Sequence, residues 1–292
     1  MMVPFFHPNF AFLPGGLEQL EHICDQAKAQ VDDQISPSRL MVEEMAMVLH
    51  LYRGQLAQAI RIGESALALR KRLGGHPYLS LNAALFLILA HAARGQYAAI
   101  EPLIDPLFLG INQEDQPPAD LAAFLFYIGR VRWLQGRLEE ARRIYARICT
   151  FIEEDPQRAI PEALICRAWM QSLLEMTAGR SGQAERLLRQ PEVLEQDRGS
   201  TVHGCTRLML ARLYWQQNRQ QEAMSELAPA LAFHQQLGIP FTILLEGQSI
   251  VPLLHFAVEQ GIHARYAADL LAMLGADETQ PIFVPQTGET LT

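Results

Sequence analysis

Six turn elements recur along this chain at almost constant spacing, and this period constrains the fold more than any other feature. Each element is a Gly or Asn, four mostly polar residues, and then a small or apolar residue that suits a helix. The elements begin at Gly54, Gly95, Gly136, Gly179, Asn218 and, more loosely, Gly261. Successive first residues are 41, 41, 43, 39 and 43 positions apart. A fixed period of about 20 to 50 residues is typical of a solenoid, in which each unit buries its apolar face only against its neighbours.

The composition of each element fits a turn between two helices. Gly readily takes the left-handed backbone conformation that ends a helix, because it has no Cβ, and Asn tolerates it. In Gly136-Arg-Leu-Glu-Glu-Ala141 the final Ala falls in the first turns of the next helix, where a small side chain lets a partner helix approach closely. We therefore expect Ala59, Ala141 and Ala223 to be buried at helix crossings.

Each turn lies between two segments with helical patterning. The apolar runs that precede the turns are Leu40–Tyr52, Leu81–Ala93, Leu121–Leu134, Ala163–Thr177, Arg207–Gln217 and Leu244–Val258. The segment after a turn has apolar or small residues at steps of three and four, as at Ala59, Ile62 and Ala66, which is typical of an amphipathic helix. No turn-bounded run of β-branched residues recurs between these segments. The sequence predicts an all-α fold, a right-handed α-solenoid of about six helical hairpins with a period of about 41 residues.

One repeat domain accounts for most of the chain. We expect it to span residues 1–276, with residues 1–14 as an atypical N-terminal cap. Pro and Gly mark the connections between hairpins, as at Gln116-Pro-Pro118 and Leu237-Gly-Ile-Pro240, because Pro cannot continue a helix. The periodicity is lost after residue 276, so residues 277–292 are expected to form a C-terminal tail.

Charge and cysteine usage favour a cytoplasmic protein that does not itself bind DNA. The net charge is −8 and the pI about 5.6, with dispersed basic residues, whereas duplex binding depends on neutralising phosphates. Cys24, Cys149, Cys166 and Cys205 have no CxxC spacing and apolar neighbours, so we expect reduced, packed thiols. No secretory signal pattern is present, and the longest apolar run is too short to span a bilayer.

The sequence carries none of the common catalytic signatures. It contains no phosphate-binding loop, dinucleotide fingerprint, zinc-protease motif or nucleophile elbow. His22 and Cys24 are two positions apart, so on a helix they point about 200° apart and cannot share a metal. Adjacent acids such as Glu139 and Glu140 fit a solvated helix face better than an acid–base pair. We therefore predict a non-enzymatic protein with no cofactor and no metal site.

Arginine and tryptophan recur at equal offsets from two of the turns. Arg130 and Trp133 precede the turn residue of their unit by six and three positions, and Arg212 and Trp215 do the same in theirs. In stacked hairpins these positions face the concave side. The residues that we expect to bind a ligand or partner there are Arg130, Trp133, Trp169, Arg212, Trp215 and His255. Such a row could hold a carboxylate, a planar ligand or a partner helix. The alternative is that the tryptophans pack between helices and the arginines lie over them.

The turn element resembles the start of the second helix in tetratricopeptide repeats, where a further small residue lies seven positions beyond the Ala, as Ala66 and Ala230 do here. These units are longer than the tetratricopeptide repeat of about 34 residues. Units that end in Leu-Gly, at Leu73 and Leu237, together with the stretch 254–274, resemble the helical-repeat region of MalT-like, LuxR-family transcriptional regulators. The resemblance covers residues 15–276. In that family an ATPase module precedes the repeats and a helix-turn-helix domain follows them.

The resemblance implies a sensor or protein-interaction solenoid, the regulatory domain of such a regulator. Its concave groove would bind a small-molecule inducer or a protein partner and so control self-association. The alternative is a free-standing adaptor that holds a partner peptide in the same groove. In either case the chain is expected to be cytoplasmic, to avoid membranes and to make no direct contact with nucleic acid.

Overall fold

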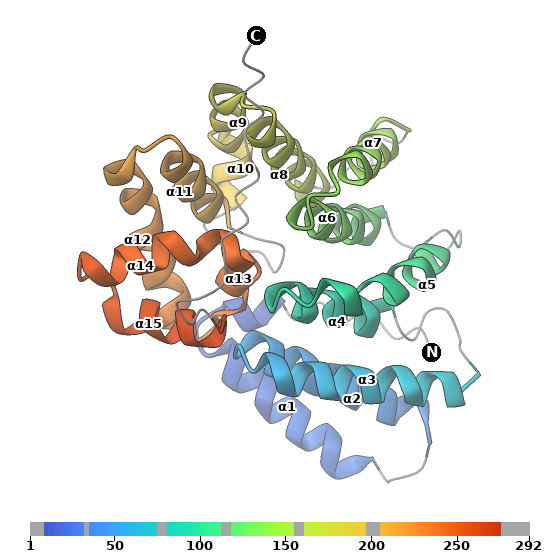
Figure 1. Ribbon diagram of the computed structural model, residues 1–292. Helices are drawn as coiled ribbons and strands as arrows, with labels where there is room; N and C mark the ends of the chain where they lie inside the picture. Colours follow the sequence, from blue (N-terminus) through green and yellow to red (C-terminus); the bar gives the residue numbers. More distant parts are fainter. Residues whose placement is uncertain are drawn as a thin grey trace.

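The structure, a computed structural model, describes residues 9–31, 35–74, 81–111, 118–154, 161–196 and 205–275. Every regular element within these residues is a helix (Figure 1), so the prediction of an all-α fold is confirmed. Residues 1–8 of the expected cap and the expected tail, residues 277–292, lie outside the described part of the chain. No described helix combines the length and the apolar character needed to cross a lipid bilayer.

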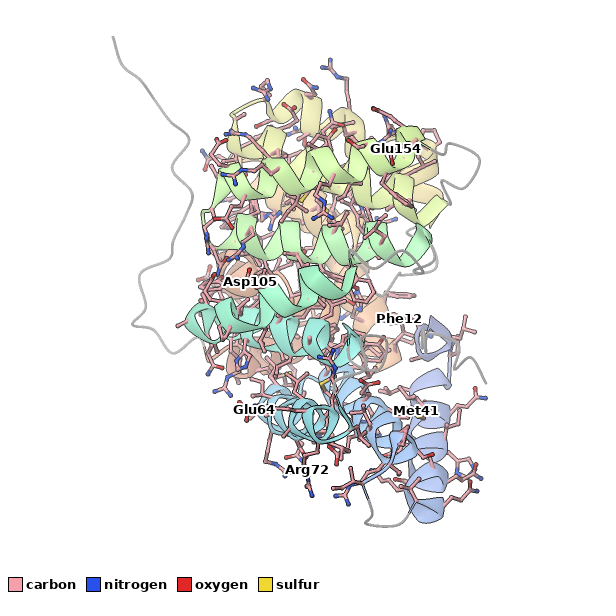
Figure 2. The ribbon with its side chains drawn as sticks, turned by 90° about the vertical axis from the view of Figure 1, so that its right-hand side faces the viewer. Phe12, Met41, Glu64, Arg72, Asp105 and Glu154 are labelled. Carbon is pink, nitrogen blue, oxygen red and sulfur yellow. The ribbon has the colours of Figure 1, made fainter. Side chains whose placement is uncertain are left out.

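The helices follow one another as hairpins after a short N-terminal portion, η1 (Asn9–Phe12) and α1 (Gly16–Gln30). The hairpins are α2 (Pro37–Tyr52) with α3 (Leu56–Arg72), α4 (Leu81–Ala93) with η3 (Tyr97–Ala99) and α5 (Glu101–Ile111), α6 (Pro118–Leu134) with α7 (Leu138–Glu154), α8 (Pro161–Thr177) with α9 (Ser181–Leu188), α11 (Thr206–Gln216) with α12 (Gln220–Leu237), and α14 (Val251–Glu259) with α15 (Ala264–Met273). Three short helices lie between them: α10 (Pro191–Gln196), α13 (Phe241–Leu244) and η5 (Gly247–Ile250). Figure 2 shows α3, α5 and α7, which carry Glu64, Asp105 and Glu154, in successive layers on one side of the molecule.

The six predicted turn residues share one backbone conformation. Their φ angles are all positive, from 59° at Asn218 to 74° at Gly136 and Gly179. In every turn the N–H of this residue donates to the carbonyl three residues back, and the next N–H donates to the carbonyl five positions before it. The second of these bonds measures 2.8 to 2.9 Å in all six turns. Together the two bonds form the Schellman motif, which satisfies carbonyls at the end of the first helix. The predicted turn positions are confirmed.

The small residues that follow the turns are buried as expected. Ala59, Ala141 and Ala223 are 0 to 1% exposed, and each lies near the start of its second helix. A methyl group at these positions lets the first and second helices of a hairpin approach closely, so their prediction from the period is confirmed.

The predicted helix Leu244–Val258 is wrong, because the chain breaks there. Instead of one helix it forms α13, a turn at Leu245 and Glu246, η5 and then α14. Pro252, in the first turn of α14, has no N–H to donate, and its ring would clash with the carbonyl of residue 248 in a continuous helix. Gly247 adopts a φ of 57°, which suits Gly far better than other residues. The break turns the segment Phe241–Ile250, here called the closing segment, towards the interior.

The closing segment touches the first helices of hairpins from both ends of the chain. The ring of Phe241 lies 5.9 Å from that of Tyr52 at the end of α2. Gly247 lies against α4, since a Cβ on it would be 3.9 Å from the carbonyl oxygen of Ala92. Glu246 is ion-paired to residues of α6 and α11. The closing segment of the same chain thus fills the inner side of the array of hairpins.

The first hairpin also meets the last one directly. At Gly54, in the turn between α2 and α3, an added Cβ would lie 2.8 Å from Met273 Sδ and 2.9 Å from Pro240 Cγ. We call this contact the seam. It brings the last turn of α15 and the start of α13 against the first hairpin, so the two ends of the array are in contact (Figure 1).

Candidate functional site

Most of the residues predicted to line the concave groove are buried. Arg130, Trp133, Trp169 and Arg212 are 5%, 3%, 1% and 2% exposed. Of the other two, Trp215 is partly exposed and His255 is exposed. The expectation that these residues line an open groove is therefore wrong for the four buried ones. The closing segment lies against two of them, Arg130 and Arg212, through Glu246. A role in ligand binding stays a prediction.

The two predicted arginines hold one carboxylate, and it belongs to the chain itself. Arg130 Nη2 donates to Glu246 Oε1 at 2.6 Å, and Arg212 Nη1 donates to Glu246 Oε2 at 2.8 Å. Glu246 is 1% exposed. Ser249 Oγ, which accepts from Arg212 Nη1 at 3.1 Å, donates to the carbonyl oxygen of Glu246 at 2.6 Å. A carboxylate was one of the three kinds of group that such an Arg row could hold, and here the closing segment supplies it.

Arg212 also stacks on a predicted tryptophan, although not on the one in its own unit. Its guanidinium carbon lies 4.6 Å from the centre of the Trp133 ring. The indole is also held through its N–H, because Trp133 Nε1 donates to Thr177 Oγ1 at 2.7 Å and to the Leu173 carbonyl at 3.2 Å. Stacking of this kind is favourable and stronger when the cation is desolvated. Arg130, Trp133, Arg212 and Glu246 form a single cluster, which we call the inner ion cluster.

The inner ion cluster has more positive than negative charge. Two guanidinium groups face one carboxylate, and Nε and Nη2 of Arg212 make no hydrogen bond within the described residues. Burial lowers the pKa of Arg212, since desolvation disfavours its charged form, while Glu246 acts against this shift. A buried ion pair is weak support for stability, but removing one partner leaves a charge that nothing compensates. Glu246 is therefore the residue on which the cluster depends.

The other predicted residues lie apart from this cluster. Trp169 Nε1 donates to Thr206 Oγ1 at 3.0 Å, and its ring is 5.6 Å from that of Phe126. The Trp215 ring is 5.2 Å from that of Phe256. His255 lies on the exposed face of α14. Of the six predicted residues, only Arg130, Trp133 and Arg212 are brought together.

Glu246 was missed by the sequence analysis, although the sequence contains a signal. It is the one charged residue in Phe241-Thr-Ile-Leu-Leu-Glu-Gly-Gln-Ser-Ile-Val-Pro-Leu-Leu254. A lone acid in an apolar run needs a buried partner, since an isolated charge is rarely buried. The Gly and Pro that follow it also indicate that this run is not one helix.

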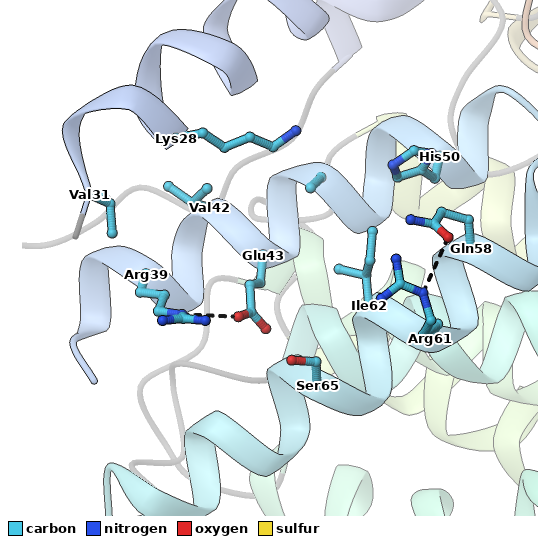
Figure 3. A pocket seen from close by; sticks show the side chains of 11 residues that line it. Lys28, Val31, Arg39, Val42, Glu43, His50, Gln58, Arg61, Ile62 and Ser65 are labelled. Atoms are coloured by element: carbon cyan, nitrogen blue, oxygen red, sulfur yellow. Dashed lines mark hydrogen bonds and ion pairs between the residues drawn. The ribbon is translucent and has the colours of Figure 1, made fainter. Parts of the chain in front are cut away.

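A cleft that the sequence analysis did not identify lies between α1, α2 and α3 (Figure 3). Its volume is about 370 Å³. One face of α2 and the facing side of α3 form its walls, and the end of α1 closes it. The lining side chains are those of Lys28, Val31, Arg39, Val42, Glu43, Ala46, His50, Gln58, Arg61, Ile62 and Ser65. We call it the α1–α3 cleft.

A second, larger cleft runs along the seam. It has a volume of about 820 Å³ and lies between the first two turns, η5 and the end of α15. His50, Arg94, Gln96 and Gln248 provide most of its polar side chains, and Met273 lies on its wall. His50 borders both clefts.

Neither the clefts nor the inner ion cluster has the makeup of a metal centre, since the described residues contain no group of three His, Cys, Asp or Glu side chains placed to hold a metal ion. All four cysteines are free, and only Cys149 among them is partly exposed.

Comparison with known proteins found no family profile that matches the chain and no curated protein with significant sequence similarity to it.

Proposed function

We propose that this chain is a non-enzymatic sensor or protein-interaction module, a right-handed solenoid of tetratricopeptide-like hairpins that serves as the regulatory domain of a MalT-like, LuxR-family transcriptional regulator in the cytoplasm. The observation that carries the proposal is the repetition of one Schellman turn at six nearly equidistant positions. Five of these turns are followed by a buried small or apolar residue, and the last is followed by the partly buried Tyr266. Repeats of this kind build extended surfaces for binding.

The seam and the closing segment favour a regulatory role. Through them, the turn at Gly54 touches Met273 in the last helix, and Glu246 connects α6 to α11. If a partner or inducer shifted the first hairpins, the movement would therefore be transmitted through these contacts to the C-terminal hairpin. In the regulators that this chain resembles, that end adjoins the DNA-binding domain.

The same arrangement weighs against the free-standing adaptor. An adaptor of that type holds its peptide on the concave side, where the first helices lie. Here the closing segment, with Phe241, Leu244 and Glu246 each 0 to 1% exposed, covers the first helices α2, α4, α6 and α11. A partner is better placed at the clefts or on the outer helices.

The proposal predicts a particular combination of activities. The purified chain should neither hydrolyse ATP nor bind duplex DNA sequence-specifically, because it has no phosphate loop and a net charge of −8. Cells from which it is deleted should nevertheless change the transcript levels of a limited set of genes. Phosphate release, fluorescence anisotropy with promoter fragments at physiological salt, and RNA sequencing provide the three readouts. Unchanged transcripts, or specific DNA binding by the chain alone, would contradict the proposal.

A further inference from the structure

The larger of the two clefts, which we call the seam cleft, borders the point at which the described part of the chain ends. Its volume is about 820 Å³, and Leu274 and Gly275 lie on its wall. Gly275 has a left-handed backbone with a φ of 65°, so the chain turns away from the axis of α15 there. An extended chain advances about 3.3–3.6 Å per residue, so residues 276–278 can span about 10 Å from this wall.

The side chains that line the seam cleft offer hydrogen-bond donors. Gln55, Gln58 and Gln96 each use the amide oxygen to accept a hydrogen bond from a neighbouring histidine or arginine. Their side-chain amide nitrogens can only donate, and they make no hydrogen bond within the described residues. Arg94 is exposed on the same cleft, and its guanidinium group makes no ion pair and no hydrogen bond with the described part of the chain.

The seam cleft lacks side chains of the opposite kind. No Asp or Glu is among the described residues that line it. A guanidinium group pairs most strongly with a carboxylate, and amide N–H groups donate to carboxylate or carbonyl oxygens. The cleft therefore fits an acidic stretch of polypeptide whose backbone carbonyls are not already used within a helix.

The chain itself supplies an acidic stretch at the edge of the cleft. Residues 276–292 contain Asp277, Glu278 and Glu289 but no Lys, Arg or His. The first two acids follow Gly275 by two and three positions, whereas Glu289 follows it by fourteen. Because Gly275 is part of the cleft wall, Asp277 and Glu278 are tethered beside the cleft that carries Arg94.

We propose that the seam cleft is the docking site of the chain's own residues 276–280. The carboxylates of Asp277 and Glu278 pair with Arg94, and the backbone carbonyls of the segment accept hydrogen bonds from the glutamine amides of the cleft. Docked in this way, the segment connects the end of α15 to the first two turns and fastens the seam. The docking does not depend on the proposed regulatory function, because it is measured on the purified chain alone.

Digestion of the full chain with a protease that cuts after glutamate tests the docking, because Glu278 and Glu289 lie in the same stretch of sequence. Cleavage after Glu278 requires the segment to leave the cleft, so docking slows it. Arg94→Glu reverses the charge of the cleft and should accelerate cleavage after Glu278 at least tenfold, while the rate after Glu289 stays the same. Mass spectrometry of the fragments over time gives both rates.

Arg142→Glu is the control for the charge reversal. Arg142 is an exposed arginine on α7, outside the seam cleft, and its replacement should change neither rate. Circular dichroism verifies the fold of both variants. An unchanged rate of cleavage after Glu278 in folded Arg94→Glu protein would overturn the proposal.

Cross-linking locates the docked segment. Arg94→Lys keeps the charge and places an amine in the cleft, in a chain whose only lysines are Lys28 and Lys71. A zero-length carbodiimide reagent joins an amine to a carboxylate that it contacts. It should link position 94 to Asp277 or Glu278 within one copy of the chain, as mass spectrometry of the digested protein would show.

Arg142→Lys is the matched control for the cross-link. The amine at position 142 should link to Glu139, the ion-pair partner of Arg142, and not to residues 276–280. If this control link forms and the link from position 94 does not, the segment is not docked in the seam cleft and the proposal is refuted. A link from position 94 to a second copy of the chain would refute it as well.

Discussion

Glu246→Gln lowers the free energy of unfolding by about 3–5 kcal/mol, the usual cost of breaking a buried ion pair by removing one partner. The amide keeps the shape of the side chain but removes its charge. Arg130 and Arg212 then remain buried, at 5% and 2% exposure, with no carboxylate between them. Urea denaturation followed by far-UV circular dichroism measures the change.

Glu139→Gln is the matched control for this substitution. Glu139 is also paired to an arginine, Arg142, but the two side chains are 75% and 50% exposed. Its removal should cost at most about 1 kcal/mol. Adding Arg212→Met to Glu246→Gln removes one of the uncompensated charges and should restore part of the lost stability. A Glu246→Gln variant as stable as the parent would show that the carboxylate does not hold the inner ion cluster together.

Gly54→Ala should destabilise the protein more than Gly95→Ala. Both glycines have a left-handed backbone, with φ of 71° and 66°, so both substitutions carry a cost of about 1–2 kcal/mol from the backbone alone. At Gly54 the new methyl also meets Pro240, Leu244 and Met273, whereas at Gly95 it meets nothing within 4 Å. Overpacking of this kind adds about 1–3 kcal/mol.

The difference between the two glycine variants isolates the seam, because the turn geometry is common to both. Thermal and urea unfolding of the two proteins, measured side by side, gives this difference. Equal losses of stability would mean that the first and last hairpins do not press against each other at Gly54.

The local structure of this chain could be predicted from its sequence because the same requirements recur in every unit. A left-handed turn needs Gly or Asn, and a close helix crossing needs a small residue. Gly136 and Ala141 therefore predict their hairpin from the local sequence alone. The helix Leu81–Ala93 was predicted with its observed bounds for the same reason. Each of these predictions depends on residues fewer than about 20 positions apart, which a pattern can capture.

The closure of the array could not be predicted in this way. Arg130 and Glu246 are 116 positions apart, and a repeat pattern describes how a unit packs on its neighbour but not how the first unit meets the last. The equal offsets of Arg130 and Arg212 from their turns did place both side chains on the inner side. What they would meet there depended on the break at Gly247 and Pro252, whose effect on the path of the chain has no local signature. The α1–α3 cleft was missed because its polar residues look like an ordinary solvated helix face in sequence.

Hydrogen–deuterium exchange of the closing segment tests most directly whether the inner side of the array is filled by the chain itself. Peptides covering Phe241–Ile250 should exchange as slowly as those from α6 and α11, which hold Glu246 through Arg130 and Arg212, because exposing these amides requires opening the core. Exchange of Phe241–Ile250 as fast as that of an unstructured peptide, with α6 and α11 still protected, would mean that the inner side is an open groove and that this account of the fold and its site is wrong.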